Sequence, residues 1–272
     1  MKKLLKIILI LCAIFVFYFA NNSWLQTSKY NLSLKKLPEK MDGLKVLQIS
    51  DLHDSKFGEN HEKLIEAVKK EKPNIIVITG DVIDSHNYKL ARSLSAIKGF
   101  VDIAPTYFVN GNHEIATNKV AEIQQSLGSA GVIVLNNEAV DFEFNGSKIS
   151  IVGIDDPLAG IKTDDMLAKA LHNVPYNRFK LLLAHRSENA SNYAKYGIDL
   201  AYTGHAHGGQ VRIPGLGGMI DHQGRFFPRY LEGVEKTGEL TQVISRGLGN
   251  SLFPLRVFNR PEIVSTTLHS TK

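Results

Sequence analysis

The sequence predicts a layered α/β domain that follows an N-terminal apolar helix. From Leu44 onward, short apolar runs alternate with amphipathic stretches, which is the order expected of strands and helices packed in layers. Several apolar runs are continuous Val, Ile and Leu, as in strands covered on both faces. Before this region, residues 7–20 carry no charge. We therefore expect one large domain with a mostly parallel core sheet, preceded by a separate apolar segment.

The N-terminal segment has the composition of a membrane anchor. Three lysines among the first six residues precede an apolar stretch that ends at Ala20, at the short end of a membrane span. A cleaved signal peptide is the alternative, but the bulky side chains of FVFYF occupy positions where a cleavage site needs small residues. We expect a single-pass anchor over 1–24 in the cell membrane, a linker over 25–43 and an extracytoplasmic domain over 44–272.

Composition limits the available chemistry. The 272 residues include one cysteine, Cys12, which lies inside the apolar N-terminal run. A disulfide within the domain, a thiolate zinc site and a cysteine nucleophile are therefore excluded. The net charge of +5 is modest and is spread along the chain. Because the dense basic stripe of a nucleic-acid binder is missing, we expect no nucleic-acid partner.

The predicted core elements follow in order along the chain. The strands are expected at residues 45–50, 74–80, 106–111, 148–154, 180–185, 200–205, 241–247 and 262–269. Helices are expected between them at 60–70, 89–98, 118–127, 164–171 and 187–195. Asn145-Gly146 predicts a β-hairpin, so part of the sheet should be antiparallel. The tract 208–233 is rich in glycine and proline and is predicted to be a long loop. Its apolar residues would either form a lip for a lipid or pack on the domain, and they are Leu216, Met219, Phe226 and Phe227.

Metal-competent side chains follow almost every predicted strand. They lie in Asp51-Leu-His53, Asp81 to Asp84, Asn112-His113-Glu114, His185 and His205-Ala-His207. Because the carboxyl ends of parallel strands line one crevice, we expect these side chains to meet there. The side chains of residues two apart in an extended chain point to the same side, so D-x-H and H-x-H could each bind one ion. Mixed imidazole and carboxylate ligands favour zinc, iron or manganese, and a bridging carboxylate would hold two ions about 3.5–4 Å apart.

The ordered set of motifs resembles the calcineurin-like metallophosphoesterase superfamily. The set is D-x-H, G-D-x-x-D, G-N-H-E, a lone His after an apolar strand and G-H-x-H, and the resemblance covers residues 44–269. GHAHGGQ at 204–210, GIDDP at 153–157 and the apolar N-terminus resemble a bacterial branch associated with the membrane or cell wall. The resemblance implies a four-layer α/β/β/α sandwich with an N-terminal transmembrane anchor helix.

The resemblance also implies a role for each motif residue. The implied ligands of two metal ions are Asp51, His53 and His207 for the first, Asn112, His185 and His205 for the second, and Asp81 as the bridge. His113 would stabilise or protonate the leaving oxygen of the substrate, and Asp84 would orient and charge His113. Ser85 replaces the arginine that usually follows G-D-x-x-D, which puts a protein-phosphatase-like substrate site in doubt.

The implied activity is hydrolysis of a phosphodiester or pyrophosphate bond at the cell envelope. Two divalent ions of manganese, iron or zinc would supply a metal-bound hydroxide as the attacking group. The expected partner is a phosphate ester, either lipid-linked or derived from the envelope. A broad-specificity phosphomonoesterase is the first alternative. A non-catalytic metal-binding envelope protein is the second, although such proteins usually show broken ligand sets.

Other polar residues have simpler explanations. Arg246, in SRGLG after a predicted strand, is the arginine best placed to contact a substrate phosphate, with a solvated surface charge as the alternative. Asp84 could instead cap a helix, and Glu114 could favour a helix N-terminus electrostatically. Asp155 and Asp156 precede a proline and are predicted to be turn residues. The histidines outside the motifs are predicted to lie at the surface, and they are His61, His86, His172, His222 and His269.

Overall fold

Two six-stranded β-sheets form the centre of the molecule. The computed structural model describes residues 2–219, 226, 229–250 and 255–271. In spatial order, the first sheet contains β1 (Gln26–Leu34), β14 (Glu262–Ser270), β2 (Leu44–Ile49), β3 (Ile75–Ile78), β4 (Thr106–Phe108) and β5 (Ile133–Val134). The second contains β12 (Gly233–Thr237), β13 (Leu240–Ile244), β9 (Leu200–Gly204), β8 (Lys180–Arg186), β7 (Ser147–Gly153) and β6 (Glu138–Phe144).

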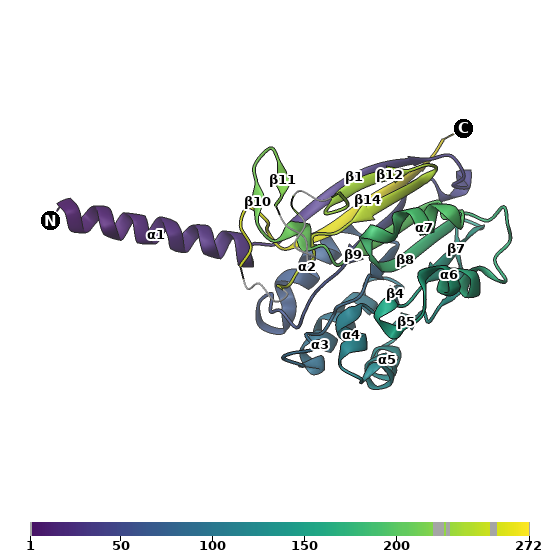
Figure 1. The fold of residues 1–272 in the computed structure, drawn as a ribbon, viewed down its shortest axis with the longest axis horizontal. Coiled ribbons are helices and arrows are strands. Elements are labelled where there is room, and N and C mark those ends of the chain that lie inside the picture. Colours follow the sequence, from purple (N-terminus) through teal and green to yellow (C-terminus); the bar gives the residue numbers. More distant parts are fainter. Residues whose placement is uncertain (1, 220–225, 227–228, 251–254, 272) are drawn as a thin grey trace.

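Helices cover the outer faces of both sheets (Figure 1). On the first sheet lie α2 (Glu62–Glu71), α3 (Leu90–Val101) and α5 (Val120–Ser129), with the short α4 (Asn112–Ala116) after β4. On the second sheet lie α6 (Thr163–Leu171) and α7 (Ala190–Lys195). The layered α/β/β/α architecture expected from the sequence is therefore confirmed.

Side-chain alternation along the central strands produces these layers. In β2, Val46 packs in the cluster between the two sheets, whereas Leu47 and Ile49 pack in the cluster under α2 and α3. A third cluster, between the second sheet and its helices, includes Leu182 and Tyr193. Successive residues of a strand face opposite sides, so the continuous apolar runs cover both faces of each sheet.

Each strand predicted from an apolar run is present. The Asn145-Gly146 turn joins β6 and β7 in an antiparallel pair, as its sequence indicates. The helix expected over 187–195 begins as a 3₁₀ turn at Ser187–Asn189 and continues as α7. Part of the loop predicted over 208–233 forms a small hairpin of β10 (Arg212–Ile213) and β11 (Gly217–Gly218). His222 and Phe227 lie outside the described residues, so their predicted positions cannot be compared.

The segment 25–43 is more than a linker. Strand β1 pairs in parallel with β14 along its whole length, from Gln26 to Leu34. Leu32 and Leu34 are buried between the two sheets. The prediction of a linker is therefore wrong for residues 26–34. The alternation of Tyr30, Leu32 and Leu34 with polar residues is typical of a strand with one buried face, and the prediction missed this signal.

Helix α1 (Lys2–Ser23) projects away from the sandwich (Figure 1). Its apolar side chains are exposed along its length, for example Phe15 at 66%. By length and composition it is able to cross a membrane, although a signal sequence passes the same test. Its last turn is tied to the domain, because Asn21 Oδ1 accepts from the Asn259 amide at 3.2 Å and Asn22 Oδ1 from the Arg256 amide at 3.0 Å.

Candidate metal centre

The predicted ligands meet at one edge of the two sheets. Strands β2, β3 and β4 are parallel neighbours in the first sheet, and β8 and β9 are parallel neighbours in the second. Their carboxyl ends therefore lead into the same region. The segments that follow these strands bring together the side chains of Asp51, His53, Asp81, Asn112, His185, His205 and His207. All of these residues except Asn112 are buried.

The first ligand group consists of Asp51, His53 and His207. The Nε2 atoms of His53 and His207 lie 3.2 Å apart. Asp51 Oδ1 lies 4.0 Å from His53 Nε2 and 3.4 Å from His207 Nε2. The three side chains therefore direct ligand atoms toward a common point, as the sequence predicts for one ion.

The second group surrounds the His185 ring. His185 Nδ1 donates to the Thr79 carbonyl at 2.7 Å, so Nε2 is the nitrogen that would bind a metal ion once the ring is neutral. Three further atoms face this nitrogen, and each lies 3.1 Å away: Asp81 Oδ2, Asn112 Oδ1 and His205 Nδ1. Ligands 2.0–2.1 Å from a tetrahedral zinc ion lie about 3.3 Å from one another. The donor set and its spacing therefore fit one divalent cation.

Asp81 lies between the two groups. Its Oδ2 is 3.1 Å from His185 Nε2 and 3.7 Å from His53 Nε2. Its other oxygen, Oδ1, accepts from the His113 backbone amide at 2.8 Å. One carboxylate oxygen thus reaches both sets of imidazoles, which is the position that a bridging ligand requires.

The backbone is strained at most of these positions. Positive φ angles occur at Asp51 (52°), His53 (45°), Asp81 (52°), His205 (69°) and His207 (47°). Residues other than glycine rarely adopt this left-handed backbone conformation, which costs about 1–3 kcal/mol per residue. Residues strained in this way are concentrated at functional sites. Here it turns each chain segment sharply after its strand, so that the side chain faces the cluster.

Two motif glycines permit the close approach of neighbouring segments. A Cβ on Gly111 would lie 2.2 Å from Asp81 Oδ1, and a Cβ on Gly204 would lie 2.5 Å from Asp51 Oδ2. Any side chain at these positions would displace a predicted ligand. The glycines of G-N-H and G-H-x-H are therefore part of the site because of the space they leave.

Burial and charge set the protonation of the cluster. Burial lowers the pKa of His53 to about 4 and holds the pKa of His207 well below its usual value. Both rings are therefore neutral at neutral pH, which is the form that binds metal. Burial raises the pKa of Asp51 to about 6. The pKa of Asp81 lies well below its usual range, because the charge and hydrogen bond of His185 outweigh the effect of burial.

Comparison with known proteins identifies the family to which this site belongs. The family model described as calcineurin-like phosphoesterase matches residues 44–209, which span all of the clustered side chains. The chain belongs to this family. It is therefore a phosphoester hydrolase of a family that depends on two metal ions, and the clustered groups are those able to hold them.

Individual relatives agree with this assignment. The chain is 30% identical over 258 residues to "Uncharacterized metallophosphoesterase YkuE" of Bacillus subtilis (strain 168), covering 91% of this chain and 86% of that protein. It is 29% identical over 261 residues to "Phosphodiesterase YaeI" of Escherichia coli (strain K12), covering 92% and 91%. The solved structure of TT1561 of Thermus thermophilus shares the fold, with a TM-score of 0.52 at 12% identity over 74% of this chain and 88% of that chain.

His113 lies beside the first ligand group of the phosphoesterase. Its ring packs edge-on against that of His53, with centroids 4.5 Å apart. The Ser85 amide donates to His113 Nδ1 at 3.0 Å, so the neutral ring carries its proton on Nε2. Asp84 Oδ1 lies 3.6 Å from Nδ1, which is an electrostatic contact without a hydrogen bond. Asp84 is thus near the ring that it was predicted to orient, while Ser85 makes the shorter contact.

Glu114 connects the two loops of the phosphoesterase site that follow β3 and β4. Its buried carboxylate accepts from the backbone amides of Asp81, Val82 and Gly111, each at 2.8 Å. Burial, followed by the charge of Asp81, raises its pKa to about 7. The prediction for Glu114 was only an electrostatic effect on a helix N-terminus, and it missed this role. The signal available was the position of Glu114 three residues after Gly111, from which a glutamate at the start of a helix reaches back to the backbone amide of the N-cap residue.

Asp54 was also missed in the sequence. This buried residue accepts from the backbone amides of Lys89 and Asp84, at 2.9 and 3.1 Å, and from Ser93 Oγ at 2.8 Å. It fixes the loop that carries Asp84 and the start of α3. No spacing in the sequence identifies it, because its partners come from a segment distant along the chain.

Two arginines near the site have carboxylate partners within the protein. Arg186, next to His185, forms a two-point contact with the buried Asp156, Nε to Oδ2 at 2.6 Å and Nη2 to Oδ1 at 3.1 Å. Arg246 Nη2 donates to Glu262 Oε1 at 2.9 Å, and its Nε lies 3.5 Å from Glu232 Oε2. Arg246 is buried, so the alternative of a solvated surface charge is wrong.

The remaining histidines differ in their environment. His61 is 2% exposed and packs at the start of α2, so its predicted surface position is wrong. Its surroundings include Arg92 of α3, which comes near His61 only in the folded chain. Among the other predicted surface histidines that the structure describes, His86 and His172 are exposed and His269 is partly exposed.

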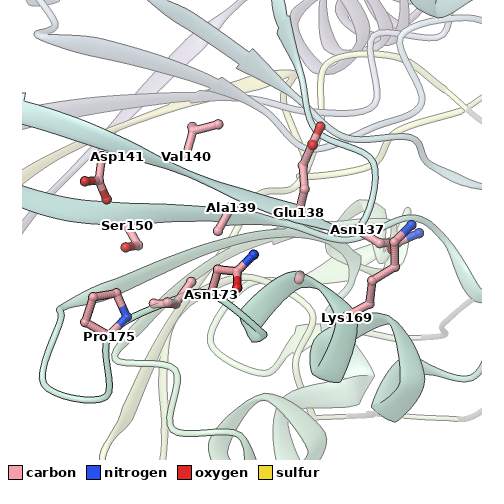
Figure 2. Close-up of a pocket in the computed structure, with 11 residues that line it drawn as sticks. Asn137, Glu138, Ala139, Val140, Asp141, Ser150, Lys169, Asn173 and Pro175 are labelled. Atoms are coloured by element: carbon pink, nitrogen blue, oxygen red, sulfur yellow. The ribbon is translucent and has the colours of Figure 1, made fainter.

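A separate cavity lies between β6, β7 and α6 (Figure 2). Its volume is about 330 Å³, and its lining includes Asn137, Asp141, Lys169 and Asn173. None of the clustered ligand residues lines it. This cavity is therefore distinct from the cluster of metal-competent side chains at the strand ends.

Proposed function

We propose that this phosphoesterase hydrolyses a phosphodiester or pyrophosphate bond of an envelope substrate. The observation that carries the proposal is the position of Asp81 Oδ2, which lies 3.1 Å from His185 Nε2 and 3.7 Å from His53 Nε2. A carboxylate oxygen shared by two imidazole groups is the arrangement that two-metal hydrolysis uses. The printed name of the YaeI relative, a phosphodiesterase, supports a diester substrate.

The proposed ligand assignment follows the two groups. One cation of manganese, iron or zinc would be held by Asp51, His53 and His207, a second by Asn112, His185 and His205, and Asp81 would contact both. When bound, the two cations would lower the pKa of water and offset charge on the phosphoryl oxygens.

The side chains around the ligands would then complete the chemistry. His113, with its proton on Nε2, would stabilise the leaving oxygen through a hydrogen bond as the ester bond breaks. Asp84, whose Oδ1 lies 3.6 Å from Nδ1, would help to orient that ring. Glu114 and Asp54 would keep the loops in place while substrate binds, because each ties three groups of the surrounding chain.

The proposed location is the cell membrane, with α1 as a single-pass anchor and the domain on the extracytoplasmic side. The exposure of apolar side chains along α1 supports membrane insertion. Protease treatment of intact cells tests the orientation. Digestion of the domain without cell lysis is the expected result, and protection until lysis would place the domain inside.

The activity is tested by metal analysis of the purified full chain followed by two substrates. With added manganese, we expect bis-p-nitrophenyl phosphate to be hydrolysed with a higher kcat/KM than p-nitrophenyl phosphate. Faster hydrolysis of the monoester would favour the phosphomonoesterase. A chain that binds two cations per molecule and cleaves neither substrate would favour the non-catalytic metal-binding protein.

A further inference from the structure

A groove at the base of α1 combines apolar walls with two arginines. It has a volume of about 500 Å³ and lies between the end of α1, the β10–β11 hairpin and the segment that precedes β14. The residues that matter here are Phe17, Asn21, Arg212, Ile213, Phe258 and Arg260. None of the clustered metal-ligand residues lines the groove. We propose that an anionic phospholipid of the surrounding bilayer binds in it, an inference that rests on the proposed insertion of α1.

The groove lies at the depth of lipid headgroups. Helix α1 has 22 residues, so it is about 33 Å long, close to the hydrocarbon thickness of about 30 Å. Its C-terminal end, where the groove opens, therefore reaches the headgroup region. Phe17 lies about 9 Å deeper than Ser23 along the helix axis. The groove thus extends from the interface into the region of the acyl chains.

Its apolar wall is presented to the bilayer side. Phe17 of α1 and Phe258 of the domain pack edge to face, with ring centroids 5.1 Å apart. Phe258 is nevertheless 52% exposed and has a φ of 50°, a conformation unfavourable for a bulky side chain. Leu216, at the turn of the β10–β11 hairpin, is 68% exposed. An acyl chain lying along these side chains would cover apolar surface that water otherwise meets.

The two arginines give the groove its charge. Arg260 is fixed by Nε and Nη2, which donate to the carbonyls of Trp24 and Leu25 at 2.9 Å each. Arg212 pairs with Glu232 through Nη2, while its buried Nη1 finds no acceptor among the residues that the structure describes. Glu232 also lies against Arg246, so its charge is shared. A phosphodiester headgroup would place a negative charge beside Arg260, which has carbonyl acceptors, and beside Arg212, whose carboxylate partner is shared.

The fluorescence of Trp24 can report the binding of a lipid in this groove. Trp24 is the only tryptophan in the sequence, and its ring lies 6.0 Å from the Arg260 guanidinium at the rim of the groove. Bromine on a lipid acyl chain quenches tryptophan fluorescence on contact. The experiment therefore uses the full chain in phosphatidylcholine nanodiscs that contain a small fraction of either brominated phosphatidylglycerol or brominated phosphatidylcholine.

We expect brominated phosphatidylglycerol to quench Trp24 more strongly than brominated phosphatidylcholine at equal content. Each basic residue near the surface is expected to contribute about a fivefold preference for an anionic lipid. The variant Arg212→Gln, which does not touch Trp24, should lower the preference about fivefold, and Arg212→Gln with Arg260→Gln should abolish it. Arg178→Gln, which removes an equal charge beside Asp141 on β6, should leave the preference unchanged.

Three outcomes overturn the proposal. Equal quenching by the two lipids in the wild type shows that the groove has no anionic preference. A preference that survives in the double variant shows that the arginines do not create it. Absence of quenching by either lipid shows that α1 is not inserted, which removes the basis of the proposal. Hydrolysis of bis-p-nitrophenyl phosphate, measured on the same samples, separates each of these results from a failure of the metal centre.

Discussion

The site depends on buried polar residues whose partners come from distant parts of the chain. Asp81 keeps a low pKa despite complete burial because His185, from the other sheet, supplies a positive charge and a hydrogen bond. His185 in turn has its pKa raised to about 10, since the effect of Asp81 outweighs that of burial. A cation bound between them would replace the proton on His185, because a ligand histidine must be neutral.

Replacement of His113 tests its proposed hydrogen bond to the leaving oxygen. His113→Ala should lower kcat by about 10²–10³-fold, the usual contribution of a positioned hydrogen-bond donor. The content of bound metal, measured by mass spectrometry of the purified chain, should stay the same. His86→Ala, at the exposed neighbour whose ring centroid lies 5.9 Å away, is the matched control and should keep full activity. Unchanged kcat in His113→Ala would remove the proposed role.

His61 should make stability depend on pH. Burial lowers its pKa in the folded chain, whereas an unfolded histidine titrates near 6.5. Between the folded value and pH 6.5 the unfolded chain binds more protons, so the stabilising effect is complete above pH 6.5 and is lost as the pH falls below it. Urea unfolding of His61→Gln should show a smaller loss of stability on acidification than the wild type. The control His172→Gln should behave like the wild type, and an identical pH dependence in His61→Gln would refute the assignment.

At the scale of elements, the end of α1 is linked to the loop that carries His207. Asn259 connects them, because its backbone amide donates to Asn21 Oδ1 at 3.2 Å and its Nδ2 donates to the His207 carbonyl at 2.7 Å. The same Nδ2 lies 3.2 Å from the Gln210 carbonyl. Asn259 therefore positions His207, a proposed metal ligand, by holding its backbone carbonyl and not its imidazole ring.

Asn259→Ala should weaken metal binding. Removal of a group that supports a ligand typically lowers metal affinity by about 10–100-fold, and we expect the lower end because only the backbone of His207 is held. Titration calorimetry with Mn²⁺ measures the effect on the full chain. Asn173→Ala, in the separate cavity beside α6, should leave the Mn²⁺ affinity unchanged. Wild-type affinity in Asn259→Ala would mean that the turn after β9 holds His207 without this support.

At the scale of the whole molecule, the boundary between α1 and the domain determines which truncated chains keep a complete core. A chain without residues 2–23 keeps β1 and should remain folded while leaving the membrane fraction. A chain without residues 2–36 also loses β1, and with it Leu32 and Leu34 from the core between the sheets. Two buried leucines contribute at least about 2 kcal/mol each, so its free energy of unfolding should fall by about 4 kcal/mol or more. Urea unfolding compares the two chains, and equal stabilities would show that β1 is dispensable.

Local pattern was sufficient for the central strands and for most of the candidate site. Residues 74–80 are apolar on both faces, as expected of a covered strand, and ligand types follow directly after this run and after 45–50. The hairpin at Asn145-Gly146 was predictable for the same reason, since the turn chemistry is local. For β1, the alternation of Tyr30, Leu32 and Leu34 indicates a strand, and only its parallel pairing with β14 depends on the fold.

The sequence by itself determined the layered fold class, the apolar N-terminal helix and the identities of the metal-competent residues, since each depends on neighbouring residues in the chain. Tertiary structure alone decided that Asp81 Oδ2 faces both His53 and His185, that Glu114 ties three backbone amides, and that His61 is buried. These features arise from contacts between segments remote in sequence. Their geometry depends on how two sheets pack, which no local periodicity encodes.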